Sequence, residues 1–166
     1  VIKDEADEDY QLAAGISQDV EADDSIIEHT KARLPWLVLA LLGGFISVKV
    51  LGLFEGAMTE HGKLFFFTPL IAAMAGNVGV QSSAIIVQGL ANNTLSGSLF
   101  NRLIKEVSLS LLNGLLLGII LFVGSHFLLN VEIIIGVIVT VALISVIIIA
   151  SLIGTFIPLL LDKFGI

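Results

Sequence analysis

Residues 132–161 read EIIIGVIVTVALISVIIIASLIGTFIPLLL, and this stretch decides the fold. From Ile133 to Leu161 it contains no charged side chain. About 20 apolar residues in a helix span the hydrocarbon core of a bilayer. A helix that is apolar on every side also has no polar face to present to water. The stretch therefore predicts a membrane-spanning helix.

Three further apolar stretches precede it, at residues 35–54, 64–91 and 103–129. Each is long enough to cross a bilayer, and each lacks the two-residue alternation of a transmembrane barrel strand. The mean hydropathy of the whole chain is +1.02, which agrees with a membrane location. The sequence therefore predicts an all-α membrane protein with a bundle of four transmembrane helices.

Charge separates the first 33 residues from the remainder. They hold ten acidic and three basic side chains, a net charge of −7, whereas the other 133 residues sum to zero. The scattered basic residues argue against nucleic-acid binding, which needs a basic stripe. The absence of cysteine excludes disulfide scaffolds and thiolate metal sites. Residues 17–31 have acidic side chains early and a lysine late, as the helix dipole favours, so we expect an acidic helical segment before the membrane part.

Lysine and arginine predict the orientation, because cytoplasmic loops carry an excess of them. With four spans, the N-terminal segment, the loop near residues 92–102 and the C-terminal end share one side. That side holds Lys31, Arg33, Arg102, Lys105 and Lys163. The opposite side holds Lys63, if Lys49 inside the first span is set aside. We therefore expect a multi-pass protein whose N-terminal segment is cytoplasmic.

The second span contains the densest set of polar and small residues. They are Gly76, Asn77, Gly79, Gln81 and Ser82. Two glycines weaken a helix, and irregular backbone at membrane depth is tolerated where it lines a polar cavity. The set therefore predicts an ion pathway, and its amide and hydroxyl oxygens suit hydrated magnesium. Helix packing through small and polar residues is the alternative.

Other polar residues give weaker signals. Glu55 and Glu106 are candidates for a vestibule, although Glu106 could instead pair with Arg102, and Glu55 could lie among lipid headgroups. Gly-x-x-x-Gly spacing predicts packing seams at 114–118 and at 52–56. The chain has no metalloprotease, serine-hydrolase or P-loop motif, so we do not expect an enzyme.

Several short motifs together carry a family resemblance. They are Arg33-Leu34-Pro35-Trp36-Leu37, Phe54-Glu55, Pro69, Gly76-Asn77-Val78-Gly79, Gln81-Ser82, Lys105-Glu106, Asn113-Gly114 and Gly154 with Pro158. In this combination, residues 33–166 resemble the MgtE family of magnesium channels and transporters. Residues 1–16 look like the end of that family's CBS-domain region. Residues 17–34 resemble its connecting, plug-type helix, and residues 35–166 its ion-permeation domain.

The resemblance implies a homodimer in the plasma membrane, with five helices per subunit and a pore for hydrated magnesium along the subunit interface. It places Gly76, Asn77 and Gly79 along the path. It also implies a regulatory magnesium sensor that closes the pore, formed by Asp4, Glu5, Asp7, Glu8 and Asp9. The sequence departs from the family at Ala73, commonly glycine, and at Val80, sometimes asparagine. It also ends before the family's fifth helix, which carries the pore aspartate.

The leading interpretation is therefore transport of a divalent cation, magnesium, gated by the acidic segment. Two alternatives stay open at this point. One is a non-transporting membrane scaffold whose acidic arm binds a basic partner. The other is a coupled secondary cation carrier, since broken helices also hold carrier sites near the bilayer midplane.

Overall fold

The computed structural model describes residues 11, 15–16, 20–95 and 97–163. The regular elements in that part of the chain are all helices. Four of them are long and apolar enough to cross a membrane, which confirms the predicted all-α membrane fold. The chain divides into two compact units, residues 1–59 and 60–166, which we describe separately.

The first unit is dominated by one long helix, α2 (Ile26–Gly52). Ser25 caps its start: the Ser25 Oγ accepts from the Glu28 amide at 3.3 Å, and Glu28 Oε2 accepts from the Ser25 amide at 2.9 Å. The helix therefore begins nine residues before the predicted span at 35–54 and runs through Pro35 without a break. Ala32 is its one buried residue, so the surface of α2 is left for lipid or protein outside this unit.

The glycine pair predicted to form a seam at 52–56 lies on two different helices. α2 ends at Gly52, and the short helix α3 (Glu55–Glu60) contains Gly56. A Cβ added at either glycine meets nothing within 4 Å. The prediction of a packing seam at these positions is therefore wrong within the described unit, because the chain turns between them.

The second unit contains the short 3-10 helix η1 (Gly62–Phe67) and the long helices α4 (Thr68–Ala91), α5 (Leu99–Phe127) and α6 (Ile133–Lys163). These three long helices correspond to the predicted spans at 64–91, 103–129 and 132–161. Pro69 lies in the first turn of α4, where its missing amide hydrogen costs no helical bond. The Ser98 Oγ caps α5 by accepting from the Asn101 amide at 3.3 Å.

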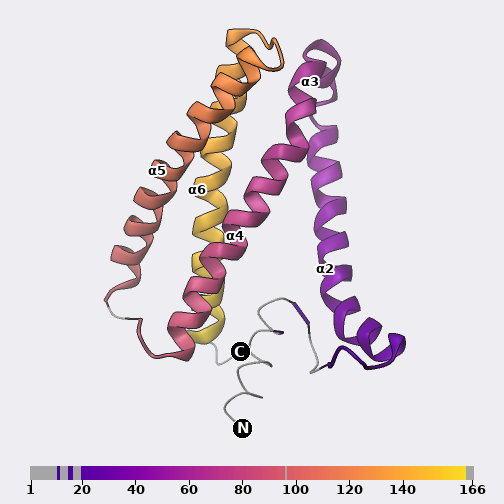
Figure 1. The fold of residues 1–166 in the computed structure, drawn as a ribbon, viewed down its shortest axis with the longest axis vertical. Helices are drawn as coiled ribbons and strands as arrows, with labels where there is room; N and C mark the ends of the chain where they lie inside the picture. Colours follow the sequence, from indigo (N-terminus) through magenta and orange to yellow (C-terminus); the bar gives the residue numbers. More distant parts are fainter. Residues whose placement is uncertain (1–10, 12–14, 17–19, 96, 164–166) are drawn as a thin grey trace. The chain divides into compact units, whose positions relative to one another are not determined.

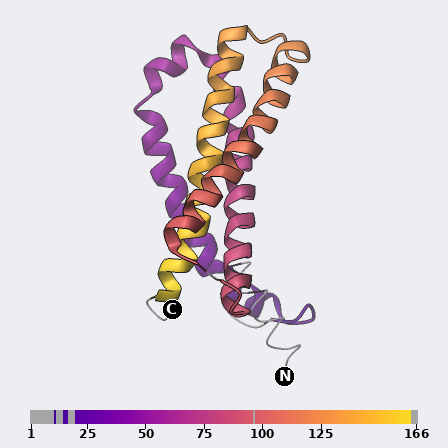
Figure 2. The ribbon, with the colours of Figure 1, turned by 90° about the vertical axis from the view of Figure 1, so that its left-hand side faces the viewer.

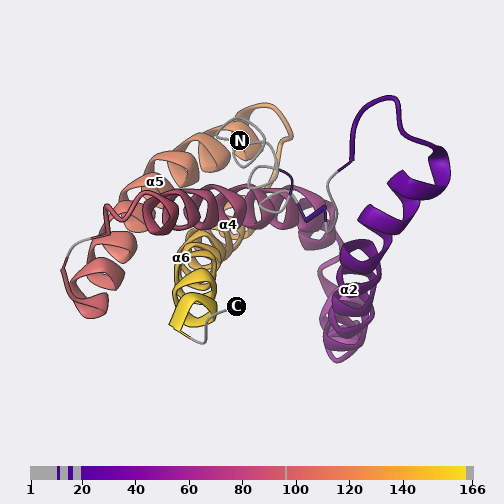
Figure 3. The ribbon, with the colours of Figure 1, turned by 90° about the horizontal axis from the view of Figure 1, so that it is seen from below.

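α6 is the central helix of this unit and packs against both α4 and α5 (Figure 1). α5 crosses the group obliquely in the view of Figure 2, and the view from below shows α6 beside both neighbours (Figure 3). Apart from Gly136, the buried residues of α6 recur every four positions. They are Ile135, Val139, Leu143, Ile147, Ser151 and Thr155. This single stripe begins in an apolar cluster with Phe67 and Val131 and ends in two hydroxyl side chains.

Glycines allow these helices to approach closely. A Cβ at Gly114 would lie 3.4 Å from Ile144 of α6, and one at Gly118 would lie 2.9 Å from the Thr140 Cγ2. The predicted seam at 114–118 is therefore confirmed. On the other side of α6, a Cβ at Gly154 would lie 3.2 Å from the Gly79 Cα and closer still to the Gly79 carbonyl oxygen.

Candidate functional site

The polar second span forms an unbroken helix. α4 continues from Thr68 to Ala91 through both Gly76 and Gly79. The expectation of irregular backbone at these glycines is therefore wrong. A glycine weakens a helix by only about 1 kcal/mol, whereas a broken turn in an apolar medium leaves several backbone groups without partners.

The continuous helix divides the predicted pathway residues between two faces. Gly76, Asn77 and Gln81 are exposed, and Asn77 and Gln81 share one side of the helix because they are four residues apart. Ser82 is buried, with 7% of its surface accessible. Gly79 faces α6, where an added Cβ would lie 3.7 Å from the Ala150 carbonyl oxygen. The two interpretations of this span, helix packing and an ion pathway, thus concern different residues: Gly79 packs against α6, whereas Asn77 is exposed and is available to a pathway.

Glu106 of α5 meets the buried side of α4. The Ser82 Oγ donates a hydrogen bond to Glu106 Oε1 at 2.7 Å. The sequence left open a pairing of Glu106 with Arg102, one turn earlier on α5. The contact that the structure gives to Glu106 is instead this bond from Ser82, which joins two residues 24 positions apart on neighbouring helices.

A cavity of about 70 Å³ lies beside this bond, with Ile147 of α6 among the residues that line it. Gln81 and Ser82 of α4 and Glu106, Ser110 and Asn113 of α5 contribute its polar lining. The two predicted groups, the polar second span and Glu106, therefore come together at one place. We name these five side chains the oxygen cluster.

A row of buried hydroxyl groups continues from the cluster into α6. The Ser110 Oγ donates to the Ser151 Oγ, which donates to the Ile148 carbonyl at 3.0 Å. The Thr155 Oγ1 is buried with no hydrogen-bond partner among the described residues. Ser110 and Ser151 were not predicted as site residues from the sequence. The spacing of Glu106, Ser110 and Asn113 could have indicated Ser110, because intervals of four and three residues place the three side chains on one helix face.

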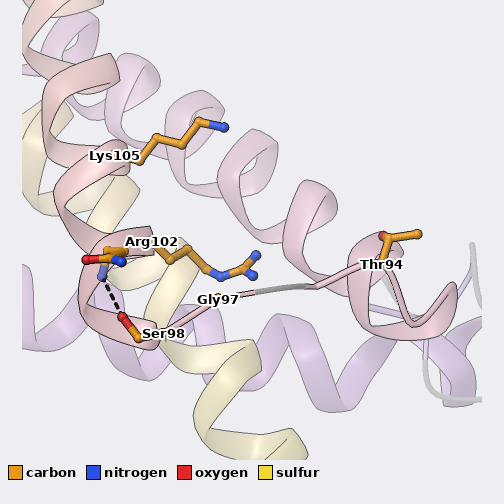
Figure 4. Close-up of a pocket in the computed structure, with 6 residues that line it drawn as sticks. Thr94, Gly97, Ser98, Arg102 and Lys105 are labelled. Atoms are coloured by element: carbon orange, nitrogen blue, oxygen red, sulfur yellow. Dashed lines mark hydrogen bonds between the residues drawn. The ribbon is translucent and has the colours of Figure 1, made fainter.

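A second, basic pocket lies at the start of α5 (Figure 4). It has a volume of about 310 Å³, and its polar lining includes Ser98, Asn101, Arg102 and Lys105. It lies at the end of the unit where α4 connects to α5 (Figure 1). Arg102 and Lys105 of this pocket are two of the five basic residues from which a cytoplasmic position is predicted for this end of the unit.

The remaining predicted residues lie apart from the oxygen cluster. Glu55 is exposed at the first turn of α3. The predicted sensor residues Asp4, Glu5, Asp7, Glu8 and Asp9 lie outside the described residues. The described part of the chain holds no group of three or more His, Cys, Asp or Glu side chains placed to bind a metal ion.

The sequence profile of the MgtE family, described as a divalent cation transporter, matches residues 68–166. The chain belongs to the MgtE family. The match begins at the first residue of α4 and includes α5 and α6, so all five members of the oxygen cluster lie within the MgtE region. Membership of this family, which is not a family of enzymes, agrees with the four apolar helices and identifies a multi-pass membrane protein.

Three proteins called magnesium transporter MgtE show the same relationship over longer stretches. The one from Bacillus subtilis (strain 168) is 33% identical over 160 residues, which is 96% of this chain and 35% of that protein. The Enterococcus faecalis relative is 35% identical over 99% of this chain and 36% of its own length. The Thermus thermophilus relative is 32% identical over 81% of the chain and 30% of its own length. The chain thus spans about a third of these MgtE relatives.

Proposed function

We propose that this chain forms membrane-spanning helices of a magnesium transporter and that Mg²⁺ passes along the exposed face of α4. Membership of the MgtE family and the names of its relatives support the ion. The observation that carries the proposal is the open position of Asn77 in the middle of a membrane-length helix. Polar side chains at membrane depth face protein or a water-filled cavity, and the exposure of Asn77 supports a pathway along this face.

The residues around Asn77 suit a hydrated ion. Ala73, Gly76 and Gln81 are exposed on the same part of α4, so the face combines small side chains with amides. Magnesium keeps several of its waters when it binds to protein. Small side chains leave room for those waters, and amide oxygens accept hydrogen bonds from them. Large lipid-facing side chains would do neither.

The assembly that we propose is a homodimer in the plasma membrane, with five helices in each subunit and a cytoplasmic N-terminal segment. The exposed amides of α4 support it, because a second subunit and a fifth helix would shield them from lipid. Glu55 would attract cations to the mouth of the path. The acidic residues at positions 4–9 would bind Mg²⁺ and close the pore when the internal concentration rises.

The decisive experiment replaces Asn77 in the full-length protein. Asn77→Ala is expected to lower Mg²⁺ uptake into proteoliposomes by about tenfold, the loss expected for one interaction worth about 1.4 kcal/mol to the passing ion. Ser145→Ala is the matched control, because Ser145 is exposed and bonds the Val141 carbonyl of its own helix at 2.9 Å. Its uptake should equal that of the unmodified protein.

The outcomes separate the competing functions. Normal uptake by the folded Asn77→Ala protein would remove α4 from the pathway. No uptake by the unmodified protein would favour the scaffold. Uptake that saturates and depends on a second ion gradient would favour a coupled carrier over a channel.

A further inference from the structure

The basic pocket at the start of α5 lies where two membrane-length helices end (Figure 4). α4 ends at Ala91 and α5 begins at Leu99. α5 has 29 residues, whereas about 20 are enough to cross the hydrocarbon core, so its ends reach the headgroup region. The pocket is therefore at the depth of lipid phosphates, whichever leaflet this end of the unit faces.

The side chains of the pocket suit an anion. Asn101, Arg102 and Lys105 follow Ser98 at three, four and seven positions and therefore share one face of α5 with it. Thr94 adds a hydroxyl group from the preceding loop. Figure 4 shows Arg102 and Lys105 extending to the same side of the helix. The lining thus combines two positive charges with several hydrogen-bond donors, and a phosphate group accepts from both kinds of group.

The charges of the pocket also distinguish one headgroup from another. Of the described residues that line it, none is acidic. Glu106, which follows Lys105 in the sequence, accepts a hydrogen bond from Ser82 at 2.7 Å and is thereby directed to α4. Arg102 and Lys105 would repel the ammonium group of a zwitterionic lipid. A headgroup whose phosphate is its one charged group meets no such repulsion, and basic pockets at the ends of membrane helices bind anionic headgroups.

The same face of α5 becomes apolar beyond the pocket. Leu109, Leu112 and Leu116 follow Lys105 at intervals of four, three and four residues, and they are 47%, 57% and 55% exposed. The glycine seam at 114–118 packs against α6 on the opposite side of the helix. A headgroup in the pocket would therefore place its acyl chains along exposed leucines. A soluble phosphate ion would make no use of this surface.

We propose that the basic pocket binds the phosphate of one anionic phospholipid, whose acyl chains lie along Leu109, Leu112 and Leu116. The exposed side chains of Ser98, Asn101 and Lys105 leave the pocket open, as a headgroup that enters from the bilayer requires. The site shares no residue with the face of α4 proposed for Mg²⁺, and it does not depend on ion transport.

The test uses the full-length protein, delipidated in detergent and studied by native mass spectrometry, which counts the lipids retained by each protein. Phosphatidylglycerol and phosphatidylcholine with identical acyl chains are added at equal concentrations. We expect one phosphatidylglycerol per chain at a concentration that leaves phosphatidylcholine unbound. Equal retention of the two lipids would overturn the proposal, because the charges of the pocket would then have no effect. Retention of neither would also overturn it and would leave this face of α5 to another helix or a second subunit.

Variants locate the lipid. Arg102→Gln and Lys105→Gln should each weaken phosphatidylglycerol binding by about fivefold, which corresponds to about 1 kcal/mol for each basic side chain. Lys105→Arg keeps the charge and should bind normally. Lys163→Gln is the matched control, because Lys163 is an exposed basic residue outside the pocket. If Arg102→Gln does not fold, Lys105→Gln decides the matter. Equal binding by the pocket variants and the control would overturn the proposal, since the lipid would then bind elsewhere.

A competition experiment separates a lipid from a soluble phosphate. Glycerol 3-phosphate carries the phosphate but no acyl chain. At ten times the lipid concentration it should leave phosphatidylglycerol in place, because it gains nothing from the leucines. Displacement of the lipid would overturn the assignment and identify the pocket as a site for free phosphate. Mg²⁺ uptake is measured separately, so neither result decides the proposed path along α4.

Discussion

The crossing of α4 and α6 at Gly79 and Gly154 gives the sharpest test of the fold. A Cβ on Gly154 would lie under 3.0 Å from the Gly79 carbonyl oxygen and 3.2 Å from both the carbonyl carbon and the Cα of Gly79. All three atoms belong to the backbone, so no side chain can rotate to make room. Gly154→Ala therefore forces the two helices apart.

The expected cost follows from two opposing effects. Overpacking a well-packed site costs about 1–3 kcal/mol, and the rigid backbone neighbours place this substitution near the upper value. Alanine in place of glycine recovers about 1 kcal/mol of helix stability. The net loss is then about 2 kcal/mol, which lowers the melting temperature of a cooperative unit of about 150–250 residues by about 4–8 °C.

The assay is thermal unfolding of the full-length protein in detergent, followed by circular dichroism. Gly124→Ala provides the matched control, because a Cβ there meets nothing within 4 Å. The control should melt at the same temperature as the unmodified protein or slightly above it. If Gly154→Ala melts together with Gly124→Ala, the close approach of α4 and α6 is not as described.

Two further predictions concern the hydroxyl row and the acidic segment. In the same unfolding assay, Ser110→Ala and Ser151→Ala should each lower the free energy of unfolding by about 1 kcal/mol, and the double variant should lower it by little more than either one. Ser108→Ala and Ser145→Ala are the control pair, because each serine bonds a carbonyl of its own helix. Their effects should add. Millimolar Mg²⁺ should slow proteolysis of residues 1–33 in the full-length protein, because neutralising a net charge of −7 compacts the segment. The triple variant Asp4→Asn, Asp7→Asn and Asp9→Asn should reduce this protection. A cleavage rate of the unmodified protein that is the same with and without Mg²⁺ would contradict a sensor.

The four membrane helices could be predicted because membrane-length apolar stretches leave few alternatives. Their ends were harder to place. α2 begins at Ile26 and not near residue 35 because Ser25 and Glu28 form a capping box, a sequence signal that the search for apolar stretches does not read. α5 likewise begins at Leu99, ahead of the predicted 103, because Ser98 caps it.

The candidate site could be predicted only in part. Spacing alone places Asn77 and Gln81 on one helix face, and the structure leaves both exposed. The bond between Ser82 and Glu106 depends on how α4 and α5 cross over α6, which no local pattern contains. Gly79 was interpreted as a weak point of the helix, whereas its role is to admit the backbone of α6.

The two faces of α4 explain why one helix contains both packing and polar residues. If Asn77 and Ser82 shared a face, a hydrated ion and a packed hydroxyl group would compete for the same space. The five-residue separation rotates them by about 140° on a helix of 3.6 residues per turn. On the proposed pathway, the exposed side can change its hydration as an ion passes, while the side with Ser82 and Gly79 packs against Glu106 of α5 and against α6. If ions follow the proposed path, the packed inner face would hold the outer amides in a constant geometry toward them.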